Sequence, residues 1–428
     1  MSFMLRGAIT ALALVASATS AEAAPCYGRA SGANQLEPSS PLTLQAVLNE
    51  VRRASPEVRA AGLEVHALGA EADQAARRLN PSILVELENF SGSGALSGFD
   101  QTETTIAVEQ TFRLGDKRGL NERAARARQA LASAECAVVL REAELQAALL
   151  FSDLLAAEDL QKLTQQTAAL SERLAATVER RVEAGAAAPP ELARARADAA
   201  TIRANAAGIA AEIEARRYAL ALLWGEANPQ FGSAVASTDV LDDALDDGPA
   251  ENPRLDAASA GLRAREAETA LARSAALPDV TVSAGFRRFE ESGDEAFIAG
   301  LSVPLPLFDR GRDTARASAF RADAAALDRQ FVEQRLLSEQ RSAAAARRAA
   351  QARLDILSQD ALPAAEEAYA AAERGYEVGR FDLTTTLNAR AVLLQTQVAV
   401  IEAERALLAE DLRLRALIGA TPFDGGLQ

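Results

Sequence analysis

Two glycine-centred segments, each inside a very long helical tract, constrain the fold of this chain more than any other feature. Each segment reads Glu-Arg-x-x-Glu-x-Gly, and the two glycines, Gly185 and Gly379, lie 194 residues apart. Other breaks in the helical pattern recur at nearly the same interval, since Pro81 and Pro278 stand 197 residues apart. Glycine and proline are the residues that end and restart helices. The recurrence of these marks predicts one structural unit written twice.

Each predicted unit contains a helix, two strands, a long helix, a turn and a further helix. A signal peptide at 1–23 and a leader at 24–41 are expected before the first unit, a linker at 226–251 between the units, and a tail at 420–428. The first repeat, 42–225, has expected strands at about 82–90 and 104–112 and a turn at about 182–191; the second, 252–419, has expected strands at about 279–289 and 297–305 and a turn at about 376–386.

The strands are identified by alternation of apolar and polar residues. In the first strand Ile83, Val85 and Leu87 fall on one face, and Glu86 and Glu88 fall on the other. Strands of about nine residues are long enough to cross a bilayer when they are tilted. Four strands cannot close a barrel, and lipid does not tolerate an open sheet edge. The pattern therefore predicts assembly, in which two chains would supply eight strands and three would supply twelve.

The helices are predicted to be long antiparallel rods that have neighbours on both sides. The tract from 117 to 182 contains no proline, and about 65 residues at 1.5 Å each make a rod of roughly 95 Å. In the last helix two apolar seams repeat every seven residues, one through Leu393 and Val400 and the other through Leu387 and Leu394. Two seams favour a closed ring of helices, whereas a plain four-helix bundle would show one broad apolar face. The fold class is mainly α with a small β part.

The N-terminus has the features of an export signal. Arg6, an apolar run at 8–16 and a small-residue ending at Ala23 are typical of a secretory signal peptide. Cys26 follows directly and leaves three interpretations open: a lipid attachment site, a disulfide with Cys136, or a free thiol. The proline before Cys26 is atypical of lipid modification, and export permits a disulfide. No run of about 18 apolar residues follows, so no transmembrane helix is predicted.

Charge and composition exclude one class of partner. The 428 residues carry a net charge of −15, which would repel nucleic-acid phosphates. The charge is compatible with an acidic soluble surface or with an acidic lumen that tolerates cations. Hydrophobic residues make up 49% of the chain but aromatic residues only 4%, which suits closely packed, alanine-rich helices better than one thick core.

Over its mature length the chain resembles the TolC family of outer-membrane efflux ducts, whose plan combines an internal repeat, paired strands and glycine-centred helical turns. Three segments are similar to the cobalt–zinc–cadmium (CzcC-like) branch: Phe-Arg-Leu-Gly-Asp-Lys-Arg-Gly at 112–119, Pro-Leu-Pro-Leu-Phe-Asp-Arg at 304–310, and Arg-Val-Glu-Ala-Gly at 181–185. The resemblance implies a homotrimer in which long antiparallel coiled-coil helices form an α-barrel. It also implies that this α-barrel continues into a 12-stranded outer-membrane β-barrel, with four strands from each chain.

The resemblance also implies partners and a location. The duct would sit in the outer-membrane lipid of a Gram-negative bacterium, with its helical barrel in the periplasm. It would work with a periplasmic membrane-fusion adaptor and an inner-membrane resistance–nodulation–division (RND) pump. Adaptor docking would use the two turns, with the residues Val182, Gly185, Glu191, Tyr376, Gly379 and Asp382.

A constriction is expected just beyond the second turn. In TolC, aspartates six and nine residues after the second turn glycine form a constricting ring. Those positions are Thr385 and Asn388 in this chain. The residues that would line the constriction here are therefore neutral, and a carboxylate ring is not expected in the second repeat.

The sequence gives little support to rival functions. Its single histidine, His66, has no cysteine or carboxylate cluster at metal-ligand spacing, and no nucleophile motif is recognisable. We therefore expect no enzyme activity and no cofactor. A periplasmic coiled-coil adaptor would have one helical hairpin where this chain has two. The expected cargo is a heavy-metal cation, with an organic compound as the alternative.

Overall fold

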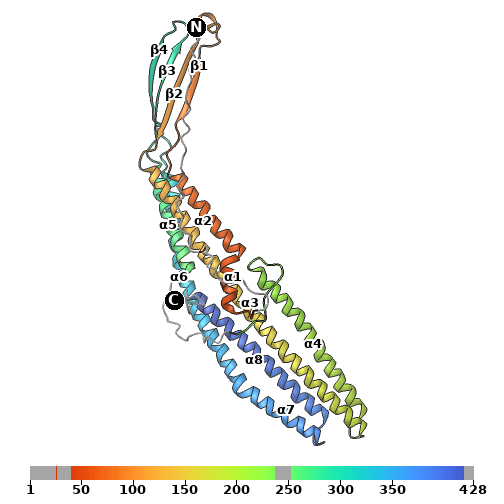
Figure 1. Ribbon diagram of the computed structural model, residues 1–428. Coiled ribbons are helices and arrows are strands. Elements are labelled where there is room, and N and C mark those ends of the chain that lie inside the picture. The colour runs from red at the N-terminus through yellow and green to blue at the C-terminus, as the bar shows by residue number, and fades with distance from the viewer. Residues whose placement is uncertain (1–25, 27–39, 237–251, 419–428) are drawn as a thin grey trace.

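The computed structural model describes Cys26 and residues 40–236 and 252–418. The expected signal peptide, most of the leader, part of the linker and the tail lie outside these residues. The molecule is elongated, with the strands at one end and two helical tips at the other (Figure 1). The helices are α1 Leu44–Ala54, α2 Pro56–Ala75, α3 Lys117–Glu183, α4 Pro189–Leu222, α5 Pro253–Ser274, α6 Arg312–Ile356, α7 Leu362–Glu377 and α8 Leu383–Leu417, with a short 3₁₀ helix at Gly94–Leu96 and a π-helical turn at Leu357–Ala361.

The four strands form one antiparallel sheet in the order β1-β2-β3-β4. They span Ser82–Glu88, Glu103–Phe112, Val280–Phe289 and Glu295–Ser302, respectively. Two strands end slightly earlier than the approximate expected bounds. β1 ends at residue 88 and not 90, because Asn89 has a positive φ of 58°, which breaks an extended strand. β4 ends at residue 302 and not 305, because Pro304 has no N–H for the ladder.

The register gives the sheet two chemically different faces. Val85, Ile106, Phe286 and Phe297 are opposite one another across the four strands and belong to one face. This mainly apolar face contains Ile83, Val85, Leu87, Ile106, Val108, Phe112, Val280, Val282, Ala284, Phe286, Phe297, Ala299 and Leu301, together with the polar residues Thr104, Gln110, Arg288 and Glu295. The opposite, mainly polar face contains Glu86, Glu88, Glu103, Thr105, Glu109, Thr111, Thr281, Ser283, Arg287 and Ser302, together with Ser82, Leu84, Ala107, Gly285, Phe289, Ala296, Ile298 and Gly300.

Helices below the sheet lie side by side in a single layer. Near the sheet α3 packs against α2 and α5, and α5 packs against α6. Toward the tips α3 packs against α4 and α8, and α8 packs against α6 and α7. The 67-residue helix α3 therefore runs through both halves of the molecule. None of the helices in the described part of the chain has the apolar stretch needed to cross a bilayer.

The second long helix departs from the expected continuous rod between about 311 and 378. A π-helical turn separates α6 from α7, and Pro363 follows it at the start of α7. Proline lacks the N–H that a helix interior requires and crowds the preceding turn. A π turn is one way in which a helix can absorb such a disturbance without ending.

The largest apolar core lies at mid-length, where α1 meets α3 and the end of α4. Phe151, Leu154 and Leu220 are fully buried there, and the Trp224 and Phe231 rings meet edge-on with centroids 5.9 Å apart. The segment after α4 returns to this core and makes a short parallel bridge between Leu42 and Ala234.

Glu158 of α3 is buried under this returning segment. Its Oε2 accepts a hydrogen bond of 2.8 Å from the backbone N–H of Ala234, and its Oε1 lies 3.6 Å from Arg217. Burial raises the pKa of the Glu158 carboxyl above its ordinary value, against the lowering effects of that hydrogen bond and of Arg217. An acid whose pKa is raised on folding contributes most stability below its unfolded pKa and less as pH rises through the folded pKa.

We therefore expect Glu158→Gln to unfold at the same or a higher temperature than the wild type at neutral pH, since the amide can still accept from Ala234. The wild type should lose stability as pH rises above the ordinary glutamate pKa. The stability of Glu158→Gln should fall less over the same range, because the amide does not titrate. Glu158→Ala is the control, because it leaves the buried N–H without an acceptor at a cost of about 1–3 kcal/mol. The measurement is thermal unfolding of both variants between pH 4 and 8. If Glu158→Gln and Glu158→Ala were equally destabilised, the proposed role of the Ala234 hydrogen bond would be wrong.

Candidate functional site: the paired helical tips

Both tips are closed by the same backbone motif. In the first, Gly185 has φ 73°, its N–H bonds Val182 O at 3.0 Å, and the next N–H bonds Arg181 O at 2.7 Å. In the second, Gly379 has φ 75°, its N–H bonds Tyr376 O at 3.0 Å, and the next N–H bonds Gly375 O at 2.7 Å. This paired bonding is a Schellman motif, in which a glycine with positive φ satisfies the last carbonyls of a helix.

The helices that leave the two tips start differently. α4 begins with Pro189, and the Glu191 carboxylate accepts the Ala188 N–H at 3.3 Å. α8 is capped by Asp382, whose side chain accepts the Thr385 N–H at 2.7 Å. Glu191 and Asp382, both expected from the sequence to dock a partner, thus also stabilise helix starts.

Arg181 joins the two tips to each other. Its guanidinium donates to the backbone oxygens of Tyr376 and Glu377, the latter at 3.2 Å, and lies over the Tyr376 ring at 4.7 Å from the centroid. The Tyr376 hydroxyl in turn donates to Glu191 across the tips at 3.4 Å. Burial, followed by the nearby Glu191 carboxylate, raises the pKa of Tyr376 and keeps its hydroxyl protonated as a donor. We call Arg181, Glu191 and Tyr376 the tip clasp.

The clasp corrects one expectation from the sequence. Tyr376 was expected to offer a surface for adaptor docking, but its side chain is only 2% exposed. It lies beneath Arg181 and beside Glu191, in a small core with Leu174, Val178 and other residues. The aromatic ring was buried because the two tips pack against each other, which its position in the linear sequence does not reveal. Tyr376 can position the tips, but it cannot itself form a contact surface.

The second tip presents apolar side chains to solvent. Val378 is 71% exposed and Phe381 49% exposed. The Phe381 ring lies against Gly375, where a side-chain Cβ would overlap the ring. The matching positions of the first tip are Ala184 and Ala187. The two tips thus have the same backbone conformation, but the second presents larger apolar side chains to solvent than the first. Thr385 and Asn388 are both exposed on α8.

Comparison with known proteins decides the family. The family model described as "Outer membrane efflux protein" matches the chain twice, at residues 47–226 and 244–420. The chain belongs to the outer membrane efflux protein family. Its relatives include the cobalt-zinc-cadmium resistance protein CzcC of Cupriavidus metallidurans, 30% identical over 371 residues, which cover 85% of this chain and 86% of that one. The nickel-cobalt-cadmium resistance protein NccC of Alcaligenes xylosoxydans xylosoxydans is 29% identical over 320 residues, 71% of this chain and 70% of that one. The resemblance stated from the sequence is confirmed.

Solved structures of similar fold agree with this assignment. The outer membrane protein VceC of Vibrio cholerae superimposes with a TM-score of 0.74 at 22% identity, over 88% of this efflux protein and 96% of VceC. CusC gives a TM-score of 0.76 at 18% identity, over 91% of this chain and 95% of CusC. At these identities the likeness establishes the fold alone.

Several residues at the tips of this efflux protein were missed from the sequence. Arg181 appeared only within a family-like segment, and Arg390 was not singled out as a functional residue. Arg390 is 4% exposed, and it donates to Ser171 of α3 at 2.8 Å and to Asp198 of α4. The sequence could have indicated a buried, paired arginine here. Arg390 lies between Leu387 and Leu394 on the apolar seam of α8, where a charge needs a partner.

The described residues offer little for metal chemistry. No group of three or more histidine, cysteine or carboxylate side chains among them is arranged to hold a metal ion. His66, the single histidine, lies on the exposed surface of α2. A metal that passes through a protein of this family would be cargo, and its passage does not require a resident site.

Variants of Asp382 can distinguish two contributions to the stability of α8: the helix-capping hydrogen bond and the negative charge of the carboxylate. Hydrogen bonds from Thr385 lower the pKa of the Asp382 carboxyl, so its contribution to stability is present above its unfolded pKa and is lost as pH falls through the folded pKa. We expect Asp382→Ala to lower the unfolding temperature at neutral pH, and Asp382→Asn to lower it less, because asparagine also caps helices but lacks the charge. Thermal unfolding of both variants measures this. Equal loss in both would mean that the charge, and not the cap, is what stabilises α8.

Proposed function

We propose that this protein is the outer-membrane exit duct of a tripartite RND efflux system, and that it passes heavy-metal cations passively from a periplasmic adaptor and pump to the exterior. The observation that carries the proposal is the similarity to CzcC over 85% of this chain. That relative is described as a cobalt-zinc-cadmium resistance protein. The paired tips and the two-faced sheet support a duct for which metal cations are cargo.

Both the sheet and the helical layer have edges without a neighbour in the single chain, which supports closure with further copies of the chain. β1 and β4 each pair with a single strand, and α2 and α4 pack mainly against α3. Helix α6 exposes Phe320, Leu327 and Phe331, spaced as one stripe along the helix. Exposed apolar stripes and unpaired strand edges both favour association. A homotrimer would give a 12-stranded barrel continued by a ring of helices.

The two faces of the sheet suit a barrel in lipid. In such a barrel the apolar face would contact lipid and the polar face would line the lumen. The polar face carries four carboxylates and one guanidinium among the described strands. Arg287 is bound by Glu88 at 2.9 Å and Glu103 at 2.8 Å, whereas Glu86 and Glu109 have no such partner within the described residues. The lumen would therefore be net negative and would favour cations.

The tips are the proposed contact with the adaptor. They lie at the end of the molecule farthest from the strands (Figure 1), which would face the periplasm. The exposed candidates are Gly185, Gly379 and Asp382, with Val182 and Glu191 partly exposed. We add Val378 and Phe381 as apolar anchors, since exposed apolar side chains on a rigid turn are effective contacts between proteins. Thr385 and Asn388 would lie just inside the mouth.

Growth of a deletion strain tests the proposed cargo. The strain should be sensitised to at least one of cobalt, zinc, cadmium and nickel, and the wild-type gene on a plasmid should restore resistance. Sensitivity to organic compounds without sensitivity to metals would instead favour the alternative, an organic-compound duct of the same fold. Recovery of the protein in the soluble periplasmic fraction would favour an adaptor and contradict the proposal.

A further inference from the structure

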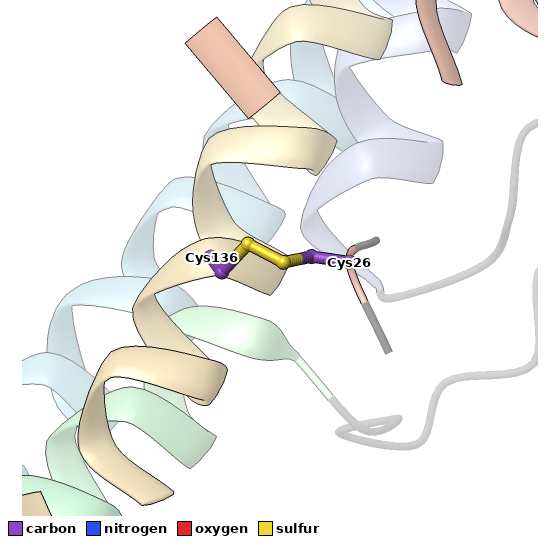
Figure 2. The surroundings of a disulfide bond; sticks show 2 residues. All are labelled: Cys26 and Cys136. Carbon is purple, nitrogen blue, oxygen red and sulfur yellow. A yellow bond between two sulfur atoms is a disulfide. The ribbon is translucent and has the colours of Figure 1, made fainter. Parts of the chain in front are cut away.

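Cys26 and Cys136 form a disulfide between the start of the chain and the longest helix. Cys136 lies on α3, and Cys26 precedes α1 (Figure 2). Their Cα atoms are 5.6 Å apart, within the normal range for a disulfide. Both side chains are 1% exposed. The bond joins residues 110 positions apart in the sequence.

The disulfide lies in an apolar groove between α2 and α3. Val65 of α2 and Ala132 of α3 are buried with the two cysteines, and Ala61 and Leu68 of α2 pack against them. Both cysteines are buried in this groove. Buried thiols in apolar surroundings react slowly with outside reagents. The bond therefore has to form before or while α2 and α3 pack together.

We propose that Cys26 serves as a covalent fastener to α3 and is not a lipid attachment site. A lipid-modified cysteine carries its diacylglyceryl group on Sγ through a thioether. In this structure the same Sγ atom is bonded to the sulfur of Cys136. One sulfur cannot carry both bonds. The apolar groove that receives Cys26 also contains Cys136, its disulfide partner. Retention of the protein in a membrane would then not depend on an acyl chain on Cys26.

The reaction that makes this bond requires an oxidant of defined class. The two thiols lose two protons and two electrons as the sulfur–sulfur bond forms. A disulfide-bearing thiol oxidoreductase accepts the electrons by thiol–disulfide exchange and is left as a dithiol. Such enzymes are found in the compartment to which exported chains are delivered. The inference does not depend on which cargo the duct carries.

The cross-link has a mechanical role at the edge of the helical layer. α2 packs mainly against α3 and has no second helix of comparable contact on its other side. The cysteine pair packs against both helices, through Val65 of α2 and Ala132 of α3. It also removes the freedom of a long unfolded loop, which is the main way in which a disulfide stabilises a protein. The bond thus ties the start of the chain to α3, and the joined cysteines pack against Val65 of α2.

Intact-mass spectrometry of the full-length protein purified from membranes tests the chemical state of Cys26. With iodoacetamide present and no reductant, we expect a mass two hydrogens below the dithiol form, with no adduct and no diacylglyceryl group. Reduction in denaturant should then allow two adducts. A diacylglyceryl mass on the peptide that contains Cys26, or alkylation without reduction, would overturn the proposal.

Stability measurements test the fastening role independently. The variants Cys26→Ser, Cys136→Ser and the double variant should lose the same amount of thermal stability, because each removes the same bond. Reduced wild-type protein should match them, which provides a comparison that requires no mutation. Losses that add in the double variant, or a Cys26→Ser variant as stable as the oxidised wild type, would contradict a shared covalent link.

Discussion

Replacing Phe297 with arginine is expected to prevent stable insertion of the protein into the outer membrane. Phe297 lies on the apolar face of β4 and is 97% exposed in the single chain. If that face contacts lipid, an arginine near the middle of the bilayer costs about 2–4 kcal/mol per chain. A homotrimer would incur this cost three times. Immunoblots of separated outer-membrane and soluble fractions should show the variant depleted from the membrane, together with loss of metal resistance.

Ser283→Arg is the matched control. Ser283 lies on the polar face of the neighbouring strand, directly opposite Glu109 in the register. The added arginine brings the same charge and bulk, but it would point into a lumen and toward a carboxylate. We expect this variant to reach the outer membrane at close to the wild-type level. If both variants were depleted equally, or if neither were, the assignment of the two faces would be wrong.

Replacing Arg181 with alanine is expected to loosen the periplasmic mouth. Arg181 donates to two backbone oxygens of the other tip and covers the Tyr376 ring. A hydrogen bond from a charged group is worth about 1.5–3 kcal/mol, so its loss should raise the population of separated tips by roughly tenfold or more. If the tips close the duct, cells with this variant should take up large hydrophilic solutes without an active pump. Assembly should remain intact, because the clasp lies at the tips, remote from the sheet.

Tyr376→Phe provides a graded comparison. It removes only the hydroxyl that donates to Glu191 at 3.4 Å and keeps the ring beneath Arg181. The leak should therefore be smaller than with Arg181→Ala. A larger leak from Tyr376→Phe, or no leak from either variant while the protein assembles normally, would mean that the clasp does not hold the mouth closed.

The strands and the tips were predictable because local chemistry determines them. Alternation at Ile83, Val85 and Leu87 marks a two-faced strand wherever it occurs. Gly185 and Gly379 end helices because a positive φ is easy only for glycine. Errors arose where a single residue overrode the pattern. Asn89 took a positive φ and shortened β1, and Pro363 required a π turn in a tract that otherwise reads as continuous helix.

The clasp could not have been predicted from the sequence, because its members come from different repeats. Arg181 of α3 and Tyr376 of α7 are 195 residues apart, and they meet because α3 and α7 both pack against α8. The sequence marked Tyr376 as a tip residue but gave no sign that it is buried. The same applies to Arg390, whose partners lie on α3 and α4. Long-range pairs of this kind depend on the order of helices in the layer, which helix-forming propensity does not specify.

Several copies of this chain are proposed to close their open edges into one tube in the outer membrane. Native mass spectrometry of the protein extracted by detergent from the outer-membrane fraction tests this most directly. We expect a particle of three chains, each of the mature mass, with no free monomer at low protein concentration. A monomer, or a protein found only in the soluble fraction, would contradict it.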